Sequence, residues 1–162
     1  LALLDRHNRH ELRRKIRKLD NVGAVNINYE GKPTDINEFF RLMAISNEQK
    51  RDFLSEKMKA FFQDIFNTFY HRKLLQLCFM KLNGINIAAS LVFLYKNQML
   101  LYNSGFDPSY SHLSPGLILK ANLIKYAIEN KITRFDFLRG GERYKYDLGA
   151  NERKLYKITF NI

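Results

Sequence analysis

The stretch NSGFDPSYSHLSPGLILKANLIKYAI, residues 103–128, joins a strand-like run to an apolar helix through a varied loop. The strand-like run ends at Asn103, and Ser-Pro-Gly at 114–116 leads directly into the helix. A helix between two strands of one sheet forms a crossover, which requires at least one parallel pair of strands. This stretch therefore favours a mixed sheet over a purely antiparallel one.

The start of this helix is a candidate anion site. Ser114 is predicted to be the N-cap, and Pro115 at the first helical position loses no hydrogen bond there. Gly116 has no Cβ, so a bulky phosphate could approach the backbone. Helix starts also expose unpaired N–H groups and the positive end of the helix dipole. The alternative is a capped helix that holds no ligand.

Residues 74–105, which precede this stretch, are predicted to form a three-stranded antiparallel meander. Runs 74–83, 85–95 and 98–105 are strand-like. Asn83-Gly84 is a strong two-residue hairpin turn, because both residues tolerate positive φ. The second run is apolar on both faces and is therefore expected to be central in the sheet.

The remaining elements complete the predicted order β-α-α-β-β-β-α-β-(α)-β. A helix over 5–19, a strand over 24–29 and a helix from Ile36 to about Ile45 come first. A longer helix follows, with an apolar stripe that we assign to the core: Leu54, Met58, Phe61, Phe62, Ile65 and Phe69. The helix after residue 114 is expected to bury Leu117, Ala121, Ile124 and Ile128. A strand over 134–140, a short helix or loop over 141–150 and a closing strand over 154–162 end the chain. The fold class is α/β (α+β), with a mixed, mainly antiparallel sheet flanked by helices.

Length and composition indicate one soluble globular domain. The chain has 162 residues, enough for one core, with 46% hydrophobic and 27% charged residues. No run of 18 apolar residues occurs, which argues against a transmembrane helix. Cys78 is the single cysteine, so an intrachain disulfide is excluded and a reducing, cytoplasmic setting is expected. Because the chain begins at Leu1, we expect a domain from a longer or processed protein.

The net charge of +11 favours polyanionic partners such as nucleic acid, phosphate-rich ligands or an acidic membrane. Residues 6–18 alone carry seven Arg and Lys against one Glu. We therefore treat residues 1–20 as a basic N-terminal helix and 21–162 as the main domain. The helix either presents a solvated face or binds RNA, membrane or an upstream part of the protein.

Three stretches together resemble the GNAT acyltransferases. They are ELRRKIRKL (11–19), GFDPSYSHLSPGLIL (105–119) and FDFLRGGERYKYDLGA (135–150), and they span nearly the whole chain. The closer similarity is to the CelD-like branch, the acetyltransferases associated with cellulose and cell-envelope polysaccharide biosynthesis, which is related to the Fem peptidyltransferases. The resemblance implies a GNAT-like fold and an upstream GNAT-like half in the full-length protein.

The resemblance also implies a donor site and a set of residues around it. The donor would be acetyl-CoA or another acyl-CoA, held without a metal. Its pyrophosphate would bind at the loop before the central helix, and its arm along the strand that ends at 103–104. The implied binding residues are His112, Leu113, Ser114, Gly116, Leu117, Asn103, Ser104 and Arg139.

Catalytic candidates come from the late stretch. In Fem-type enzymes a Phe/Tyr-Lys pair contributes a lysine to the reacting donor, and Tyr144-Lys145 occupies the matching place. Direct attack by an amine needs an oriented donor, a stabilised oxyanion and a proton acceptor. Glu142 and Asp136 are the acceptor candidates carried forward, beside structural roles for each. Cys78, in mid-strand, is assigned to the core.

Other site classes find little support. His7-x-x-His10 is the sole metal-like spacing, and no phosphate-binding Walker loop, G-x-G-x-x-G or Gly-x-Ser-x-Gly pattern occurs. The leading hypothesis is therefore an N-acyltransferase that acts on an amine of a sugar, peptide or other small molecule. The first alternative is a Fem-like peptidyltransferase that uses aminoacyl-tRNA. The second is a GNAT-like interaction domain without catalysis.

Overall fold

The computed structural model describes residues 4–160 and contains one five-stranded sheet. The strands follow one another across the sheet in the order β1-β2-β3-β4-β5. Pairs β1–β2, β2–β3 and β3–β4 are antiparallel, and β4–β5 is parallel. The strands are β1 (Val25–Asn28), β2 (Leu75–Leu82), β3 (Ile85–Tyr95), β4 (Gln98–Phe106) and β5 (Arg134–Asp136). The predicted mixed sheet and its meander are confirmed.

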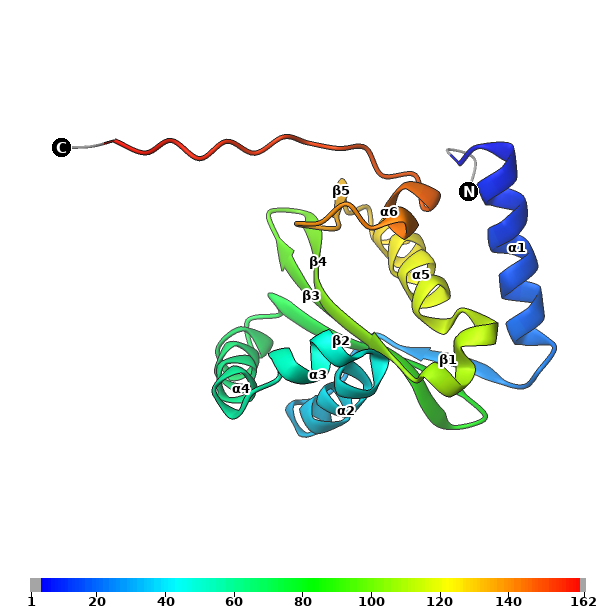
Figure 1. Ribbon diagram of the computed structural model, residues 1–162, viewed down its shortest axis with the longest axis horizontal. Coiled ribbons are helices and arrows are strands. Elements are labelled where there is room, and N and C mark those ends of the chain that lie inside the picture. The colour runs from blue at the N-terminus through cyan, green and yellow to red at the C-terminus, as the bar shows by residue number, and fades with distance from the viewer. Residues whose placement is uncertain (1–3, 161–162) are drawn as a thin grey trace.

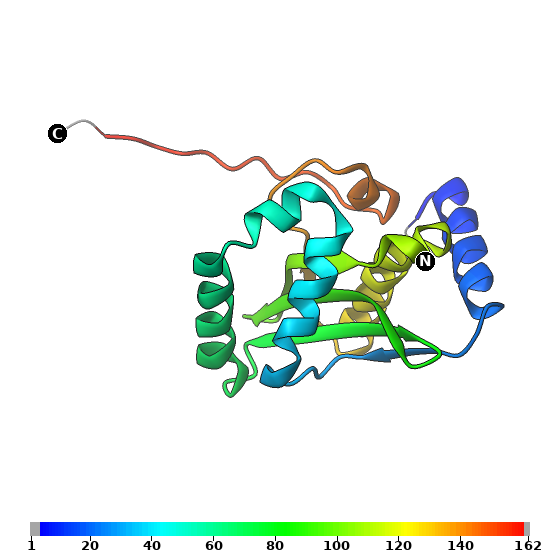
Figure 2. The same ribbon diagram turned by 60° about the horizontal axis from the view of Figure 1, so that its bottom comes forward.

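Helices cover both faces of this sheet. On one face lie α2, α3 and α4, and on the other lies α5, with α1 beside it (Figures 1 and 2). The helices are α1 (Arg6–Asp20), α2 (Ile36–Ser46), α3 (Glu48–Phe53), α4 (Glu56–Tyr70), α5 (Pro115–Glu129) and α6 (Arg143–Asp147). Two 3-10 turns, η1 (Pro33–Asp35) and η2 (Pro108–Leu113), precede α2 and α5.

Each face has its own apolar core. On one side Phe39 of α2 and Phe62 of α4 are fully buried and pack edge to face, with ring centroids 5.9 Å apart. On the other side Leu119 and Leu123 of α5 are fully buried. Cys78 of β2 is buried beside Leu123, as predicted. Two layers of helices on one sheet thus bury the central strands on both faces, which explains their continuous apolar sequence.

The sheet opens between β4 and β5. Only three residue pairs join these strands, Gln98–Arg134, Met99–Phe135 and Leu100–Asp136. Beyond them β4 continues to Phe106 along β3, while the chain after Asp136 turns away into a loop. We call the space between residues 101–106 and the loop 137–142 the fork. It lies at the carboxyl ends of two parallel strands, a position that favours ligand sites in α/β sheets.

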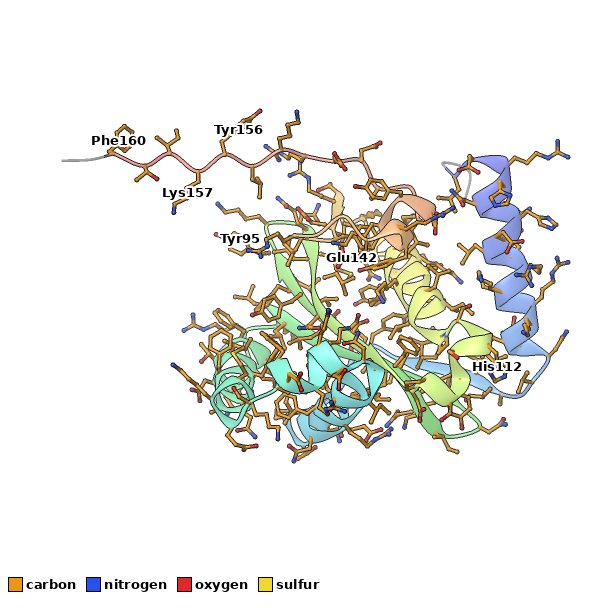
Figure 3. All side chains as sticks on the ribbon, in the orientation of Figure 1. Tyr95, His112, Glu142, Tyr156, Lys157 and Phe160 are labelled. Atoms are coloured by element: carbon orange, nitrogen blue, oxygen red, sulfur yellow. The ribbon has the colours of Figure 1, made fainter. Side chains whose placement is uncertain are left out.

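Two predicted strands differ from the structure. The expected closing strand over 154–162 is wrong, because residues 154–160 have no secondary structure, while 161–162 lie outside the described residues. The tail leaves the body of the domain, and the side chains of Tyr156 and Phe160 are 83% and 81% exposed (Figure 3). The strand expected over 134–140 stops at Asp136. Strand propensity alone cannot form a strand when the pairing edge is missing.

Two helix predictions also need correction. The longer helix is α4, as predicted, but Leu54 lies in the turn before it, and Phe61 is 45% exposed and so does not belong to the core. In α5 the predicted buried face is wrong, since Ile128 is 64% exposed and Leu117, Ala121 and Ile124 are only partly buried. The buried face comprises Pro115, Ile118, Leu119, Lys120, Leu123 and Ala127. Because α5 is apolar on most sides, periodicity did not separate its faces.

Candidate active site

The loop before α5 is held by the basic helix α1 rather than by its own cap. Ser114 is the N-cap residue of α5, as predicted, but it has φ 56° and ψ 44° and its side chain caps no N–H. Its Oγ instead accepts a hydrogen bond from Lys15 Nζ of α1, at 3.3 Å. Lys18 Nζ donates to the backbone carbonyl of His112, at 3.0 Å. Two cations of α1 therefore lie at the start of α5.

The backbone of α5 offers free donors beside these cations. The first helical hydrogen bond runs from Ile118 N to Ser114 O, at 3.1 Å. The N–H groups of Gly116 and Leu117 precede it and have no acceptor within the helix. A hollow of about 270 Å³ next to Leu117 is lined by α1, α5 and the turn at α6: His7, Asn8, Glu11, Leu12, Lys15, Leu117, Arg143, Asp147 and Leu148.

Gly116 serves packing as well as backbone access. A Cβ at this position would lie 3.3 Å from the ring of Phe106 and 3.7 Å from Lys120 Nζ. The glycine therefore lets the start of α5 approach the end of β4, at the entrance to the fork. The sequence predicts access for a phosphate at Gly116 but does not reveal this packing requirement.

Lys145 is held by a set of acceptors in the late loop. Its side chain is almost fully buried, and its Nζ donates to the carbonyls of Arg139, at 2.9 Å, and Gly140, at 3.0 Å. It also pairs with Glu142 Oε2 at 2.8 Å. The hydrogen bond from Lys145 lowers the pKa of the Glu142 carboxyl. Three acceptors match the three donors of an ammonium group, so Lys145 ties the loop 139–142 to α6.

Two further lysines in the fork were missed by the sequence analysis. Lys120 of α5 is 7% exposed, and its Nζ donates to Gly116 O at 3.1 Å. Burial, and the nearby charge of Lys50, lower the pKa of Lys120 to about 7. Lys50 of α3 is partly buried, its pKa is lowered by burial, and it donates to Ser104 O. A charged residue inside the apolar run LILKANLI was the signal that could have found Lys120.

Tyr144 covers Lys120 from the side of α6. Its ring centroid lies 4.8 Å from Lys120 Nζ, a cation–π distance, and 5.9 Å from the ring of Phe137. Burial raises the pKa of Tyr144 to about 12, so the phenol keeps its proton at neutral pH. The predicted candidate Tyr144 thus lies in the fork, together with Glu142.

The other predicted residues are spread over the fork and its surroundings. Asp136 ends β5, and its Oδ1 accepts a hydrogen bond from Leu138 N at 2.7 Å, the structural role considered for it. Asn103 Oδ1 accepts from Ser104 N at 2.9 Å. Leu113 is buried, whereas the side chains of His112 and Arg139 are exposed. Figure 3 shows His112 by η2 and Glu142 close to α6, in separate parts of the molecule.

Two other kinds of site find no support among residues 4–160. In this part of the chain, no group of three or more His, Cys, Asp or Glu side chains could hold a metal ion. None of the helices described is long and apolar enough to cross a membrane. The start of α5 and the fork gather the cations described above and are the candidate sites.

Comparisons with known proteins agree with this geometry. A model of the acetyltransferase (GNAT) domain family matches residues 6–146. Among solved structures, FemX is similar with a TM-score of 0.69 and 14% identity, over 84% of this chain and 48% of FemX. A predicted acetyltransferase from Clostridium acetobutylicum, solved with acetyl-CoA, gives 0.62 and 15%, over 85% of this chain and 96% of that one.

A third similar structure is the ribosomal-protein-S18-alanine N-acetyltransferase of Escherichia coli, with a TM-score of 0.53 and 16% identity over 67% of this chain. The chain spans 63% of that enzyme and 48% of FemX. No curated protein matches the sequence. At these identities the structural likeness shows the fold, while the family model covers most of the sequence. The chain belongs to the acetyltransferase (GNAT) domain family.

Proposed function

We propose that this domain transfers an acyl group from an acyl-CoA donor to an amine by direct attack. The observation that carries the proposal is the family match over residues 6–146, combined with the start of α5 lying at the mouth of the fork. The pyrophosphate would accept hydrogen bonds from the N–H groups of Gly116 and Leu117. The acyl arm would pass into the fork beside β4.

The lysines of α1 support the donor site. Lys15 and Lys18 already hydrogen-bond the loop 112–114, so their charges lie where phosphates would bind. A pyrophosphate gains from a nearby cation and from the helix dipole together. The predicted binding roles of His112 and Ser114 find less support than those of Gly116 and Leu117. Lys18 occupies His112 O, Lys15 occupies Ser114 Oγ, and Ser114 N donates to Ser111 O, while Leu113 is buried.

The reaction needs no covalent enzyme intermediate. The amine attacks the thioester carbonyl, the C–S bond breaks, and the thiolate leaves with coenzyme A. Orientation of donor and acceptor in the fork can lower the activation barrier by up to about 7–11 kcal/mol. Tyr144 is the candidate for a hydrogen bond to the leaving thiolate, while its pKa, raised to about 12, disfavours full transfer of the phenol proton. Glu142 and Asp136 remain candidates for accepting the proton of the amine. Lys145 remains the candidate cation beside the reacting donor.

A calorimetric titration with coenzyme A and acetyl-CoA tests the donor. We expect saturable binding, weakened about tenfold by Lys18→Glu, because one opposite charge at the loop costs about 1.4 kcal/mol. Arg13→Glu is the matched control, since Arg13 lies on α1, carries the same charge and is exposed. Equal loss in both variants would mean a general charge effect, and no binding at all would remove coenzyme A from the proposal.

Within the family we place the chain in the CelD-like branch, with a cytoplasmic setting and a small-molecule, sugar or peptide amine as acceptor. The late stretch FDFLRGGERYK supports this placement. An upstream GNAT-like half, which the similarity to about half of FemX also suggests, is part of the same proposal.

Aminoacyl-tRNA is the second candidate donor. The net charge of +11, concentrated on α1, and the similarity to FemX favour it. Binding to tRNA would weaken steeply with salt, since each phosphate contact adds to the salt dependence. A filter-binding titration with aminoacyl-tRNA at low ionic strength decides the matter, and failure to bind there would exclude this donor. If neither donor binds, the non-catalytic alternative is favoured.

A further inference from the structure

Two lysines from opposite faces of the sheet converge in the fork. Lys50 belongs to α3 on one face, and Lys120 belongs to α5 on the other. They meet because the sheet is open between β4 and β5 beyond Leu100. The charge of Lys50 is close enough to lower the pKa of Lys120. The fork therefore brings two positive charges together away from bulk water.

Neither lysine has an ion-pair partner, although the charge of Glu142 acts on both in the direction that raises their pKa. Within residues 4–160, no carboxylate lies at ion-pair distance from Lys50 or Lys120. The nearby carboxylate, Glu142, pairs with Lys145 at 2.8 Å. Each of the two lysines donates to one backbone carbonyl, Ser104 O and Gly116 O respectively. An ammonium group has three donors, so most of their hydrogen-bonding capacity is unused.

Such an arrangement is unfavourable unless something neutralises it. Two like charges repel more strongly in the protein interior than in water. A buried charge without an ion partner also carries a desolvation cost. An anion placed between the two lysines would remove both costs and would satisfy the unused donors. The partly buried side chain of Lys50 and the exposed Glu142 leave an approach from solvent.

We propose that Lys50 and Lys120 form an anion subsite in the fork, which binds a carboxylate or phosphate group of the acceptor. The acceptor amine would then belong to an anionic molecule, such as an amino acid, a peptide with a free carboxylate or a phosphorylated amine. The assignment of the bound molecule as an acyl acceptor rests on the proposed function. The subsite itself rests only on the two lysines and their partners.

The acceptor is favoured over the donor because of position. The donor phosphates would bind outside the fork, at the N–H groups of Gly116 and Leu117 and beside Lys15 and Lys18. Lys120 lies one helical turn further along α5, on its buried face and under the ring of Tyr144. The group held there would share the fork with the reacting amine.

The first test uses inorganic phosphate and acetate as probes, titrated at constant ionic strength and followed by thermal unfolding. We expect saturable stabilisation of the wild type by at least one of them. Lys50→Met and Lys120→Met should each weaken the apparent affinity at least tenfold. Methionine replaces most of the aliphatic part of the lysine side chain and removes the charge, so both variants are expected to fold. Lys125→Met is the matched control, an exposed lysine on the same helix, and should bind like the wild type.

The second test separates acceptor from donor by titrating coenzyme A into the same variants. We expect Lys120→Met to keep coenzyme A affinity within about threefold while losing the response to the small anions. An equal loss of both would place donor phosphates in the fork and overturn the acceptor assignment. Unchanged anion binding in both lysine variants, or none in the wild type, would overturn the subsite. Anion binding without any coenzyme A binding would instead count against the proposed function.

Discussion

Two neighbouring turns of this domain each bury a lysine, and only one of them provides the acceptors that a lysine needs. The turn before α6 surrounds Lys145 with Arg139 O, Gly140 O and Glu142. The first turn of α5 gives Lys120 one carbonyl, Gly116 O, and the face of an aromatic ring. Their side chains are equally hidden, at 5% and 7% exposed.

The difference teaches that burial does not by itself indicate function. Lys145 was the catalytic candidate from the sequence, yet its three donors are used in holding the loop together. Lys120 was not considered, yet it is the lysine whose unused donors point into the fork. A fully paired buried charge supports structure, whereas an unpaired one costs stability and is a better candidate for binding.

The largest expected effect comes from removing the paired lysine. Lys145→Met should lower the free energy of unfolding by about 2–3 kcal/mol, because it leaves Glu142 and two carbonyls without their donor. Urea unfolding measures the loss. Lys154→Met, in the exposed tail, is the control and should change stability by less than about 0.5 kcal/mol. A loss as small for Lys145→Met as for the control would show that its contacts do not hold the loop.

Removing the unpaired lysine should have the opposite sign. Lys120→Met should raise the free energy of unfolding at pH 7 by about 1–2 kcal/mol, because an apolar side chain of similar length replaces a buried charge. The same urea measurement applies, with Lys125→Met as the control on the same helix. Destabilisation by Lys120→Met would mean that the ammonium is better solvated in the fork than its contacts indicate.

The pH dependence sharpens the same comparison. The pKa of Lys120 is about 7 in the folded protein, below its ordinary value, so the unfolded chain binds the extra proton between about pH 7 and 10. The contribution of Lys120 to the free energy of unfolding therefore rises with pH across that range and is lowest below pH 7. The advantage of Lys120→Met over the wild type should shrink by about 1 kcal/mol or more between pH 7 and 9. Paired urea titrations at the two pH values measure it, and a constant difference would contradict the lowered pKa.

The smallest effect concerns the aromatic ring over Lys120. Tyr144→Leu should cost about 0.5–1 kcal/mol, since it removes the cation–π contact, while Tyr144→Phe keeps the ring face and should cost less. If the Leu and Phe variants lose the same amount, the hydroxyl matters and the contact with Lys120 does not. Thermal unfolding of the two variants, with and without Lys120→Met, measures the coupling directly.

Much of the fold was predictable because local signals and topology agreed. The Asn83-Gly84 turn and the apolar run of β3 predicted the meander, and the crossover through α5 predicted a mixed sheet. The closing strand was not predictable, because residues 154–160 have strand-like residues but no pairing edge in the structure. The buried face of α5 was missed because Leu117 and Ile128 are as apolar as the residues that face the sheet.

The site was predicted in outline only. Gly116 and Glu142 both lie close to Lys120 in the fork, and the roles assigned to them stay predictions. The partnerships were not visible, because Lys15 contacts Ser114 across 99 positions of sequence and Lys50 reaches Ser104 across 54. Such contacts depend on how α1 and α3 pack, which no local pattern specifies.

The central claim, that the start of α5 holds an acyl-CoA donor, is tested most directly by following backbone amides in a coenzyme A titration by NMR. We predict that the amides of Gly116 and Leu117 show some of the largest chemical-shift changes. These changes should saturate with the affinity that calorimetry gives. Donor binding elsewhere would be revealed by saturable shifts that leave these two amides unchanged, and that result would contradict the account.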